Sequence, residues 1–519
     1  MSQATYDVLI VGSGPAGVSA AFPLLAAGLK VAMVDGSHAT ALPARADRVI
    51  ESFGADLSAL LPQDDRSPKQ RLYRSRQLTR EHAERTGLES RDFRASGAIA
   101  RGGLSTVWGA YVAEFDDADL HGYPITAADL RASYDAVARR IGISGISDDP
   151  LGPFHGTTAG LLPPPPLHPA AAILLDAAAR ATPGPLTLGR ARNALLTVAG
   201  EAHGGRAACV LCKGCLWRCA GNSIYASVHD LPRLRGLPGF ALVDDFYVER
   251  IGRAGELWEA SGPAGNLRAR RILLAAGTLG STRILLESFG MSEQPVRMLS
   301  NPLVALPVWV PKAAWQAEAA SGHSLAQLGL RMELAGSGYA AGALYSLEGL
   351  PLDFITAKLP LSLAGGSAVS AWLAGSLLVA TVYFPGSHSA NTLSLQPGPG
   401  GARLRVQGGA RDDFAAVCAA LLAGLRRQLR RFGALPLPGA QQAPMGLDNH
   451  YAGTCPMGGS GPLATDAHGA LLAASGVHVV DGAALPNLPA KHLTFTIMAN
   501  ADRIARAVAA QMAAAGPAA

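Results

Sequence analysis

The sequence has few charged residues, 16% of its 519 positions, and few aromatic residues, 6%. A charged fraction of about 25% is usual for globular domains, and disordered chains and coiled coils carry more. The scarcity of charge therefore excludes both of these classes. The net charge of +5 is small for this length, and no stretch concentrates Lys and Arg, so the sequence predicts no nucleic-acid partner.

The sequence also lacks a recognisable targeting segment. The first residues carry no basic cluster ahead of an apolar stretch, as a secretory signal would. The uncharged stretch 361–384 is long enough to cross a bilayer. Its glycines and serines, and its β-branched end, instead favour buried strands joined by a turn. We therefore expect a cytoplasmic protein without a membrane span.

Six cysteines are too few for a disulfide scaffold in so long a chain. Four of them nevertheless fall close together, at Cys209, Cys212, Cys215 and Cys219. This C-x2-C-x2-C-x3-C spacing matches a bacterial ferredoxin, except that Ala220 replaces the usual proline. Three interpretations stay open: an iron–sulfur cluster, unmodified packing thiols, or a zinc site, for which the spacing is cramped.

Glycine-rich segments are what the chain has in abundance, and the first lies at the N-terminus. Residues 8–17 read VLIVGSGPAG, so that Gly12, Gly14 and Gly17 form GxGxxG between an apolar strand and a helix. Such glycines allow a tight turn, bring the backbone to a pyrophosphate and pack helix against strand. Asp35 ends the next strand, near the position of an acid that binds a ribose hydroxyl. The pattern predicts a dinucleotide site rather than a merely structural βαβ unit, and the later glycine-rich segments favour FAD over NAD.

Three further segments carry a family resemblance. They read GGLSTVWG at 102–109, LLAAGTLGSTRILLES at 273–288 and HYAGTCPMG at 450–458, the last followed by VDG at 480–482 and HLTFTI at 492–497. In this order they closely resemble the glucose–methanol–choline (GMC) oxidoreductases, a family of FAD enzymes. The resemblance is most specific at the C-terminus. It is weakest over residues 298–400, which shape the substrate pocket in that family.

The resemblance implies a place for each part of FAD. The adenosine half would be bound by Gly12, Gly14, Gly17 and Asp35, the flavin would be lined by Gly102, Gly103 and Ser105, and the ribityl chain and pyrophosphate would be reached by Asp481 and Gly482. Family members with covalently attached FAD use a histidine near the position of Ser105. Here the neighbours are Thr106, Val107 and Trp108, so we expect non-covalent FAD.

The resemblance also implies a catalytic pair. His450 stands at the position of the family's catalytic histidine, and His492 at that of its partner beside the flavin. Hydride transfer from a CH–OH carbon to flavin N5 becomes feasible as the hydroxyl proton leaves, and histidine suits this proton because its pKa lies near neutrality. A second histidine can hydrogen-bond the same oxygen and orient the C–H bond.

These features predict an FAD-dependent oxidoreductase, either a dehydrogenase or an oxidase, acting on the CH–OH group of a sugar, polyol or larger alcohol. An iron–sulfur cluster would favour a dehydrogenase that passes electrons to an acceptor protein over an oxidase that reduces O2. One alternative is a flavin-containing lyase, like the hydroxynitrile lyases of the same family. Another is a flavin-binding protein without turnover.

The expected fold is α/β with two domains, because 519 residues exceed the roughly 250–300 that one core supports. We predict a Rossmann-like FAD-binding domain built from residues 1–125, 200–297 and 440–519. A substrate-binding domain with a mainly antiparallel sheet would comprise residues 126–199 and 298–439. Residues 64–94, rich in Arg, Glu and Asp, should form an exposed loop and helix. Further helices are expected at 126–141, capped by Thr126, and at 496–512.

Overall fold

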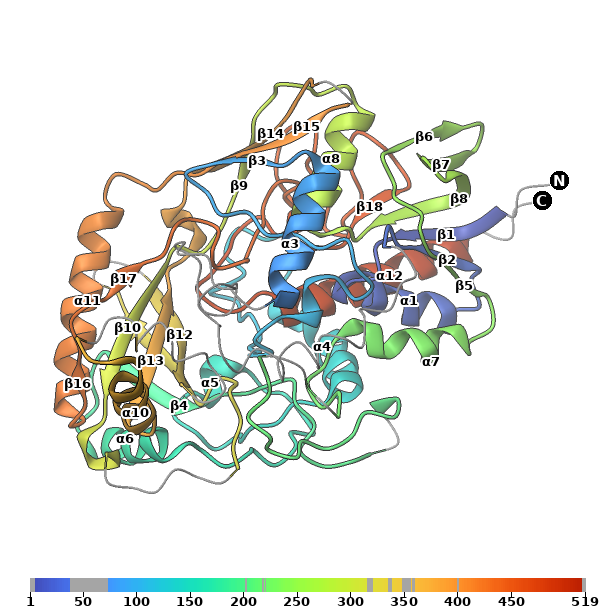
Figure 1. The fold of residues 1–519 in the computed structure, drawn as a ribbon. Coiled ribbons are helices and arrows are strands. Elements are labelled where there is room, and N and C mark those ends of the chain that lie inside the picture. The colour runs from blue at the N-terminus through green and yellow to red at the C-terminus, as the bar shows by residue number, and fades with distance from the viewer. Residues whose placement is uncertain are drawn as a thin grey trace.

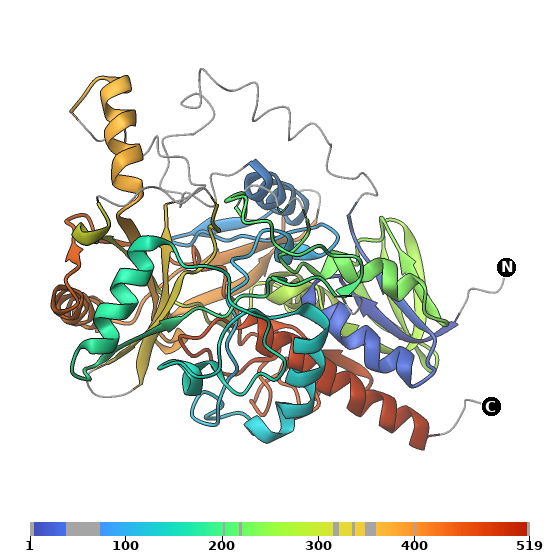
Figure 2. The same cartoon turned by 90° about the horizontal axis from the view of Figure 1, so that it is seen from below.

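The computed structural model describes residues 5–37, 73–200, 203–216, 219, 221–314, 321–334, 338–347, 356, 360–398 and 401–515. Two large sheets lie at opposite ends of the molecule, and the first described strand, β1 (Thr5–Val11), and the last described helix, α12 (Thr494–Ala514), both lie at the end of the first sheet (Figures 1 and 2). The predicted helix at 126–141 is α4 (Ala127–Ile141), and the carboxylate of Asp129 accepts hydrogen bonds from the backbone N–H and hydroxyl of Thr126 at its start. The predicted last helix is α12 (Thr494–Ala514).

The first sheet contains the predicted dinucleotide unit. Its described strands run in the order β5 (Phe240–Val243), β2 (Val31–Val34), β1 (Thr5–Val11), β8 (Gly265–Leu274), β7 (Leu257–Gly262) and β6 (Arg250–Ala254), and β18 (Val477–Val479) also pairs with β8. The strands from β5 to β8, and β18, are parallel, whereas β7 and β6 form an antiparallel extension. Segments far apart in the sequence thus form one sheet, as a Rossmann-like domain of discontinuous segments requires.

Helices cover both faces of this sheet. On one face, α1 (Pro15–Ala26) and α12 pack together over a fully buried core that includes Val8 and Ile10 of β1 and Ile504 of α12. The opposite face of β1, with Leu9 and Val11, joins a second core that also contains Leu285 of α8 (Gly277–Ser288). Because both faces of β1 are buried over residues 8–11, this part of the strand is continuously apolar instead of alternating.

The second sheet is antiparallel, as predicted. Its described strands run in the order β16 (Leu435–Pro436), β10 (Leu303–Trp309), β13 (Leu377–Tyr383), β12 (Tyr339–Ser346), β11 (Leu328–Glu333) and β4 (Leu186–Arg190), with β17 (Gln441–Gln442) beside β10. One face packs against α6 (Pro169–Arg180) and α11 (Phe414–Arg431) in a separate apolar core. The other face is turned toward the first sheet. Together the two sheets confirm the predicted α/β class.

Smaller elements complete the described chain. A third sheet has the strand order β3 (Glu89–Arg91), β15 (Arg403–Gln407), β14 (Asn391–Gln396), β9 (Val296–Met298). The remaining helices are α3 (Tyr73–Thr86), α5 (Gly152–His155), α7 (Leu231–Arg235), α10 (Leu363–Ala374) and the short 3-10 turns η2 (Gly103–Thr106), η4 (Ser227–Asp230), η5 (Pro311–Ala313), η6 (Gly386–His388) and η7 (Gly482–Ala484). Of the predicted excursion at 64–94, residues 64–72 lie outside the described part. The exact domain boundaries given above stay a proposal.

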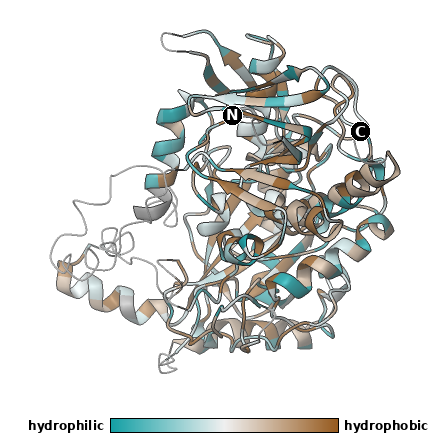
Figure 3. Cartoon of the chain, turned by 90° about the vertical axis from the view of Figure 1, so that its right-hand side faces the viewer, coloured by the Kyte–Doolittle hydropathy of each residue, from teal (hydrophilic) through white to brown (hydrophobic). Residues whose placement is uncertain are grey.

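The stretch 361–384 corrects one prediction. Its second half is strand β13, as expected, but its first half is the helix α10, which begins at a Ser362 cap and projects from the body of the molecule (Figure 2). The lack of charge was interpreted as burial, yet Leu363 is 80% exposed. Within the described ranges, no helix combines the length and apolarity needed to cross a bilayer. Figure 3 shows that strongly apolar residues are concentrated in the interior strands.

Candidate active site

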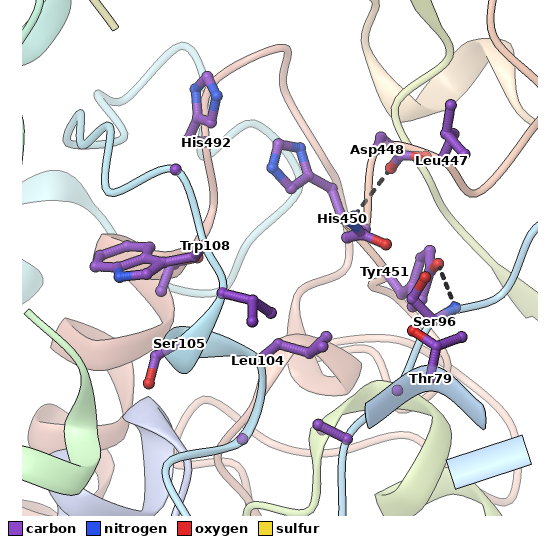
Figure 4. A pocket seen from close by; sticks show the side chains of 18 of the residues that line it. Thr79, Ser96, Leu104, Ser105, Trp108, Leu447, Asp448, His450, Tyr451 and His492 are labelled. Atoms are coloured by element: carbon purple, nitrogen blue, oxygen red, sulfur yellow. Dashed lines mark hydrogen bonds between the residues drawn. The ribbon is translucent and has the colours of Figure 1, made fainter. Parts of the chain in front are cut away.

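A cavity of about 1850 Å³ lies between the first and second sheets. Its lining comes from the glycine turn after β1, from η2, from the start of α8, from strands β10 and β13, and from the segment before α12. Figure 4 shows part of this lining, with His450 and His492 facing the same space. The volume exceeds the roughly 300–1,000 Å³ of an ordinary ligand pocket, so the cavity has room for a large cofactor together with a substrate.

Two glycines of the segment after β1, Gly12 and Gly17, cannot be replaced by a larger residue without strain or a clash. A Cβ atom on Gly17 would lie 2.0 Å from the carbonyl oxygen of Gly12, and Gly12 has a positive φ of 109°. A Cβ on Gly14, by contrast, would meet no atom within 4 Å. Gly14 precedes α1, whose first N–H groups have no side-chain cap. The helix end is therefore open toward the cavity, where an anionic phosphate group can accept its hydrogen bonds.

Hydrogen bonds connect this turn to the second glycine-rich segment. The hydroxyl of Ser13 donates to Asp35 and accepts from the backbone N–H of Gly102 at 3.0 Å. The hydroxyl of Ser105 donates to the Gly102 carbonyl and accepts from the backbone N–H of Ser227. Ser105 lines the cavity, but its hydroxyl is occupied in holding the segment together. A contact of Ser105 with a bound cofactor would therefore not depend on its hydroxyl, which is already hydrogen-bonded within the protein.

His82 of α3 also lines this cavity and was not predicted as a site residue. Its side chain is buried, and no described residue pairs with Nδ1. Burial, and secondarily Arg283, lowers the pKa of His82 to about 4, so the ring is neutral. A buried polar atom without a partner is costly, and a ligand in the cavity could supply the missing hydrogen bond. This orphaned nitrogen and the open glycine turn both fit the presence of FAD.

Asp481 and Gly482 line the cavity beside the start of α8. The Asp481 carboxylate accepts hydrogen bonds from the Ser281 hydroxyl and from the backbone N–H of Ala483, and burial raises the pKa of Asp481 to about 6. A Cβ on Gly482 would lie 2.6 Å from the carbonyl oxygen of Tyr451. Only glycine therefore fits between this turn and the segment that carries His450.

The two predicted catalytic histidines lie side by side. Their ring centroids are 5.2 Å apart with an interplanar angle of 76°. The backbone N–H groups of both His450 and Asn301 donate to one carboxylate oxygen of Asp448, at 3.0 and 2.9 Å (Figure 4 shows the first). Asp448 thereby connects the segment just before β10, which contains Asn301, to the turn that carries His450.

Asn301 determines which nitrogen of His450 carries the proton. Its side-chain N–H2 donates to the carbonyls of Phe384 and Pro489, at 2.7 and 3.0 Å, which fixes the amide orientation. The amide oxygen then faces Nδ1 of His450 at 3.0 Å and can only accept. Nδ1 must therefore carry the hydrogen in the neutral ring, and Nε2 has the lone pair. A histidine in this tautomer can act as a base through Nε2.

Two tyrosines frame the histidine pair. The Tyr383 ring stacks on His450 with centroids 5.0 Å apart and meets His492 edge-on at the same distance. Tyr111 meets His492 edge-on at 4.7 Å and bonds through its hydroxyl to Nε2 of His155 at 2.8 Å. Both tyrosines line the cavity. The two histidines thus lie between the aromatic rings of Tyr111 and Tyr383.

The residue before His492 is a fully buried lysine. Lys491 is 1% exposed, and its Nζ lies 2.6 Å from Asp119, 3.0 Å from Asp116 and 2.9 Å from the Glu114 carbonyl oxygen. Its charge also lies over the Phe154 ring. This cluster fixes the backbone immediately before His492, and it was not predicted from the sequence.

The four clustered cysteines lie outside the main cavity. They line one small space of about 10 Å³, and all are free thiols. Backbone N–H groups of Ser223 and Ser324 point at the sulfurs of Cys219 and Cys215, at 3.1 and 3.4 Å, and burial raises the pKa of Cys215 to about 12. In the described part of the chain, no group of three or more His, Cys, Asp or Glu residues could hold a metal ion. Because all four cysteines line this one space and Cys212 is exposed, the three interpretations of the cluster stay open.

Comparisons with known proteins agree with this fold. Residues 5–52 match a family model for an FAD binding domain, and residues 409–501 match the model for GMC oxidoreductase. A 6'''-hydroxyparomomycin C oxidase of Streptomyces lividus is 28% identical over 310 residues, which cover 54% of this chain and 50% of that protein. The chain thus spans about half the length of this relative. The crystal structure of pyridoxine 4-oxidase from Mesorbium loti matches with a TM-score of 0.55 and 17% identity, over 97% of this chain and 99% of that one.

The fold and the nucleotide cavity define an FAD-binding protein with an antiparallel second sheet. The match at the C-terminal end, which contains His450 and His492, is more specific. This part of the chain is similar to the GMC oxidoreductase family, whose model matches residues 409–501.

Most of the predicted cofactor residues line the cavity, namely Gly12, Gly14, Asp35, Gly103, Ser105, Asp481 and Gly482. Gly17 and Gly102 do not: Gly17 packs α1 on the turn, and Gly102 forms a left-handed bend before η2. Sequence reasoning missed Asn301, Tyr383 and Lys491, although Lys491 directly precedes His492. Of these three residues, only Lys491 had a signal in the sequence, because it is an isolated lysine among apolar residues.

Proposed function

We propose that this protein is an FAD-dependent oxidoreductase that oxidises the CH–OH group of an alcohol, with His450 as the base and His492 as its partner. The tautomer of His450 carries this proposal. Asn301 keeps the proton on Nδ1, so that Nε2 can accept the hydroxyl proton of a substrate.

Each residue of the pair has a separate task in the proposed reaction. Nε2 of His450 accepts the hydroxyl proton, while His492 hydrogen-bonds the same oxygen and orients the carbon. His492 is positioned by the ion pair of the preceding residue, Lys491, and by the ring of Tyr111. Bound FAD supplies the hydride acceptor, its N5, so that the alcohol loses one hydride and one proton and becomes a carbonyl compound. Tyr383 covers His450 and keeps water from one face of its ring.

We propose that the cofactor would be held without a covalent bond by the residues lining the glycine turn, η2 and Asp481. This proposal rests on the residues after Ser105, which are Thr106, Val107 and Trp108 and include no histidine. Acid precipitation should therefore release the flavin into the supernatant. Flavin that remained with the precipitated polypeptide would contradict a non-covalent site.

We further propose dioxygen as the electron acceptor, because the two similar proteins named above are oxidases by name. An iron–sulfur cluster at the four cysteines is the competing proposal, with an acceptor protein as partner. It requires near-stoichiometric iron and acid-labile sulfide after anaerobic purification. Substrate-dependent oxygen consumption by iron-free protein would decide for dioxygen.

The test of the base is the variant His450→Ala. We expect it to bind FAD normally and to be reduced by substrate roughly 10²–10⁴-fold more slowly, with part of the loss recovered at high pH, where the alcohol ionises without a base. His492→Ala should also be slower. The double variant should lose less than the product of the two effects, since both groups act on one oxygen.

Rapid mixing under anaerobic conditions isolates the half-reaction from any acceptor. Reduction of the His450→Ala flavin at the parental rate would refute the assignment of the base. Complete failure of alcohols to bleach the parental flavin would instead favour the lyase or the flavin-binding protein without turnover.

A further inference from the structure

The second sheet presents a mainly apolar face to the cavity. Along β10 the side chains alternate strictly: Val304, Leu306 and Val308 are fully buried in the core against α6 and α11, whereas the odd-numbered residues are half-buried. Of these, Leu303, Ala305 and Pro307 line the cavity. Strand β13 repeats the pattern, with Leu378, Ala380 and Val382 in the core and Val379, Thr381 and Tyr383 at the cavity. This period of two places alternate residues on opposite faces.

The strand register aligns these residues in three rows. Leu303 pairs with Tyr383 in the row beside the histidines, Ala305 pairs with Thr381 in the next, and Pro307 pairs with Val379 in the third. In the third row, β12 contributes Tyr345 opposite Val379. Thr381 is the polar residue of the middle row, and its hydroxyl donates to the carbonyl of Ala343. The other polar groups of these rows are the hydroxyls of Tyr383 and Tyr345, and Gln441 and Gln442 of β17 line the cavity beside β10. The remaining side chains of the three rows are apolar and offer no hydrogen bond to a bound molecule.

Charged side chains among the described lining residues all lie elsewhere. Asp35 and Asp481 lie at the nucleotide side, and Arg283 of α8 donates to the carbonyl of Val248. The Asp448 carboxylate accepts the backbone N–H groups of Asn301 and His450. In the described lining, no carboxylate or cation remains on the sheet face to pair with a charged substrate. Burying unpaired hydroxyl groups against such a face is costly too, so a sugar would bind poorly.

The face extends well away from the reacting end. Tyr383 stacks on His450, and Val379 lies four residues further along the same strand, which corresponds to roughly 13 Å at the rise of a β-strand. Beyond Val379 the cavity lining continues with Leu377 and with Leu373 of α10. A substrate with its hydroxyl at the histidines can therefore lay an apolar body along three rows of the sheet.

We propose that the substrate is an apolar primary alcohol, with its hydroxyl at the end of an alkyl or aryl body that packs on the face formed by β10 and β13. This inference rests on the proposed function, because it assigns His450 and His492 to the hydroxyl end. Burial of each added methylene on this face should strengthen transition-state binding, until the third row is covered.

The first experiment measures anaerobic flavin reduction of the holoenzyme by straight-chain primary alcohols from ethanol to decanol, with benzyl alcohol, glucose, glycerol and choline for comparison. The second-order rate constant should rise roughly two- to fourfold per methylene and level off at the long end. Glucose, glycerol and choline should be slower than octanol by at least about 100-fold. Faster reduction by glucose or choline, or no dependence on chain length, would overturn the inference while leaving the proposed oxidation intact.

A variant tests the face itself. Val379→Thr keeps the shape of the side chain and adds a hydroxyl to the third row, so we expect the rate constant for octanol to fall roughly 3- to 10-fold. Reduction by butanol, which is too short to reach that row, should be unchanged. The same substitution at the exposed Val198, outside the cavity lining, is the matched control. Equal losses for both alcohols, or no loss for either, would contradict the proposed path of the substrate.

A binding measurement separates the proposed alcohol oxidation from the proposed apolar substrate site. Octanal and benzaldehyde, the expected products, should perturb the flavin absorption spectrum on titration, and Val379→Thr should weaken octanal binding. If no alcohol reduces the flavin but the aldehydes bind in this way, the proposed oxidation fails and the apolar site stands. If neither aldehyde perturbs the spectrum, the apolar site is refuted.

Discussion

At the scale of single residues, Asp448 is an acid in an unusual place. It is buried behind His450, and its carboxylate is bonded to two backbone N–H groups instead of a cation. Burial is the main reason that the pKa of Asp448 is raised to about 7, because the backbone hydrogen bonds act in the opposite direction. The residue that positions the turn carrying His450 is therefore also a titrating group near neutral pH.

A pH dependence of stability follows from Asp448. In the unfolded chain an aspartate ionises near pH 4, so between about pH 4 and pH 7 the folded state binds more protons at this residue than the unfolded state. The contribution of Asp448 to the free energy of unfolding is therefore complete below about pH 4 and is lost as the pH rises through about 7. Relative to Asp448→Asn, the parental protein should lose up to about 4 kcal/mol between pH 4 and pH 8.

Denaturant unfolding of both proteins at a series of pH values measures this difference. Asp412→Asn, which changes an exposed carboxylate, is the control and should show no such trend against the parental protein. A difference between the parental protein and Asp448→Asn that is constant with pH would contradict the raised pKa.

At the scale of elements, the short segment between η7 and α12 has to hold His492 at a fixed place. The segment has little regular structure of its own, and its anchor is the ion cluster of Lys491 with Asp116 and Asp119. The helix α12 follows directly and packs against α1 and α4. Ion pairs of Lys491 thus fix the chain just before His492, and the packing of α12 fixes the chain just after it.

Removing the lysine should be costly, because Asp119 would be left as a buried charge without its cation. We expect Lys491→Met to lower the free energy of unfolding by roughly 3–5 kcal/mol and to slow flavin reduction through displacement of His492. Arg411→Met breaks the exposed pair of Arg411 with Asp413 and should cost less than about 1 kcal/mol. Chemical denaturation and rapid mixing measure the two effects. Equal stability of both variants would show that the cluster is not an anchor.

At the scale of the whole molecule, the cavity separates the two sheets, and a bound cofactor would contact elements that are distant in sequence, such as β1, α3 and α8. A ligand that binds only the folded state stabilises it by mass action. FAD at 100 times its dissociation constant should therefore raise the free energy of unfolding by about 2.7 kcal/mol.

The unpaired nitrogen of His82 makes this linkage testable at one residue. His82→Leu should need several times more FAD than the parental apoprotein for the same rise in melting temperature, because the hydrogen bond to the cofactor is lost. His121→Leu, at an exposed position, should behave as the parental protein does. An unchanged FAD dependence in His82→Leu would exclude His82 from the cofactor site.

The sequence by itself determined what depends on local geometry. Gly12 and Gly17 could be assigned because a tight strand–helix turn has no room for a Cβ, and Thr126 because a helix start needs a capping group. The α/β class followed from the same local patterns. His450 and His492 were predicted through a motif, and that they act as a catalytic pair remains a proposal.

Only the tertiary structure decided which side chains meet across the chain. Asn301 and His450 are 149 positions apart, and Lys491 reaches a carbonyl 377 positions away. No local pattern encodes such contacts, because they arise when separate elements pack into one core. The helix α10 shows the converse: its apolar, uncharged sequence suggested a buried strand, yet the fold leaves Leu363 exposed to solvent. Hydropathy favours burial, but the packing of the other elements determines which apolar segments obtain it.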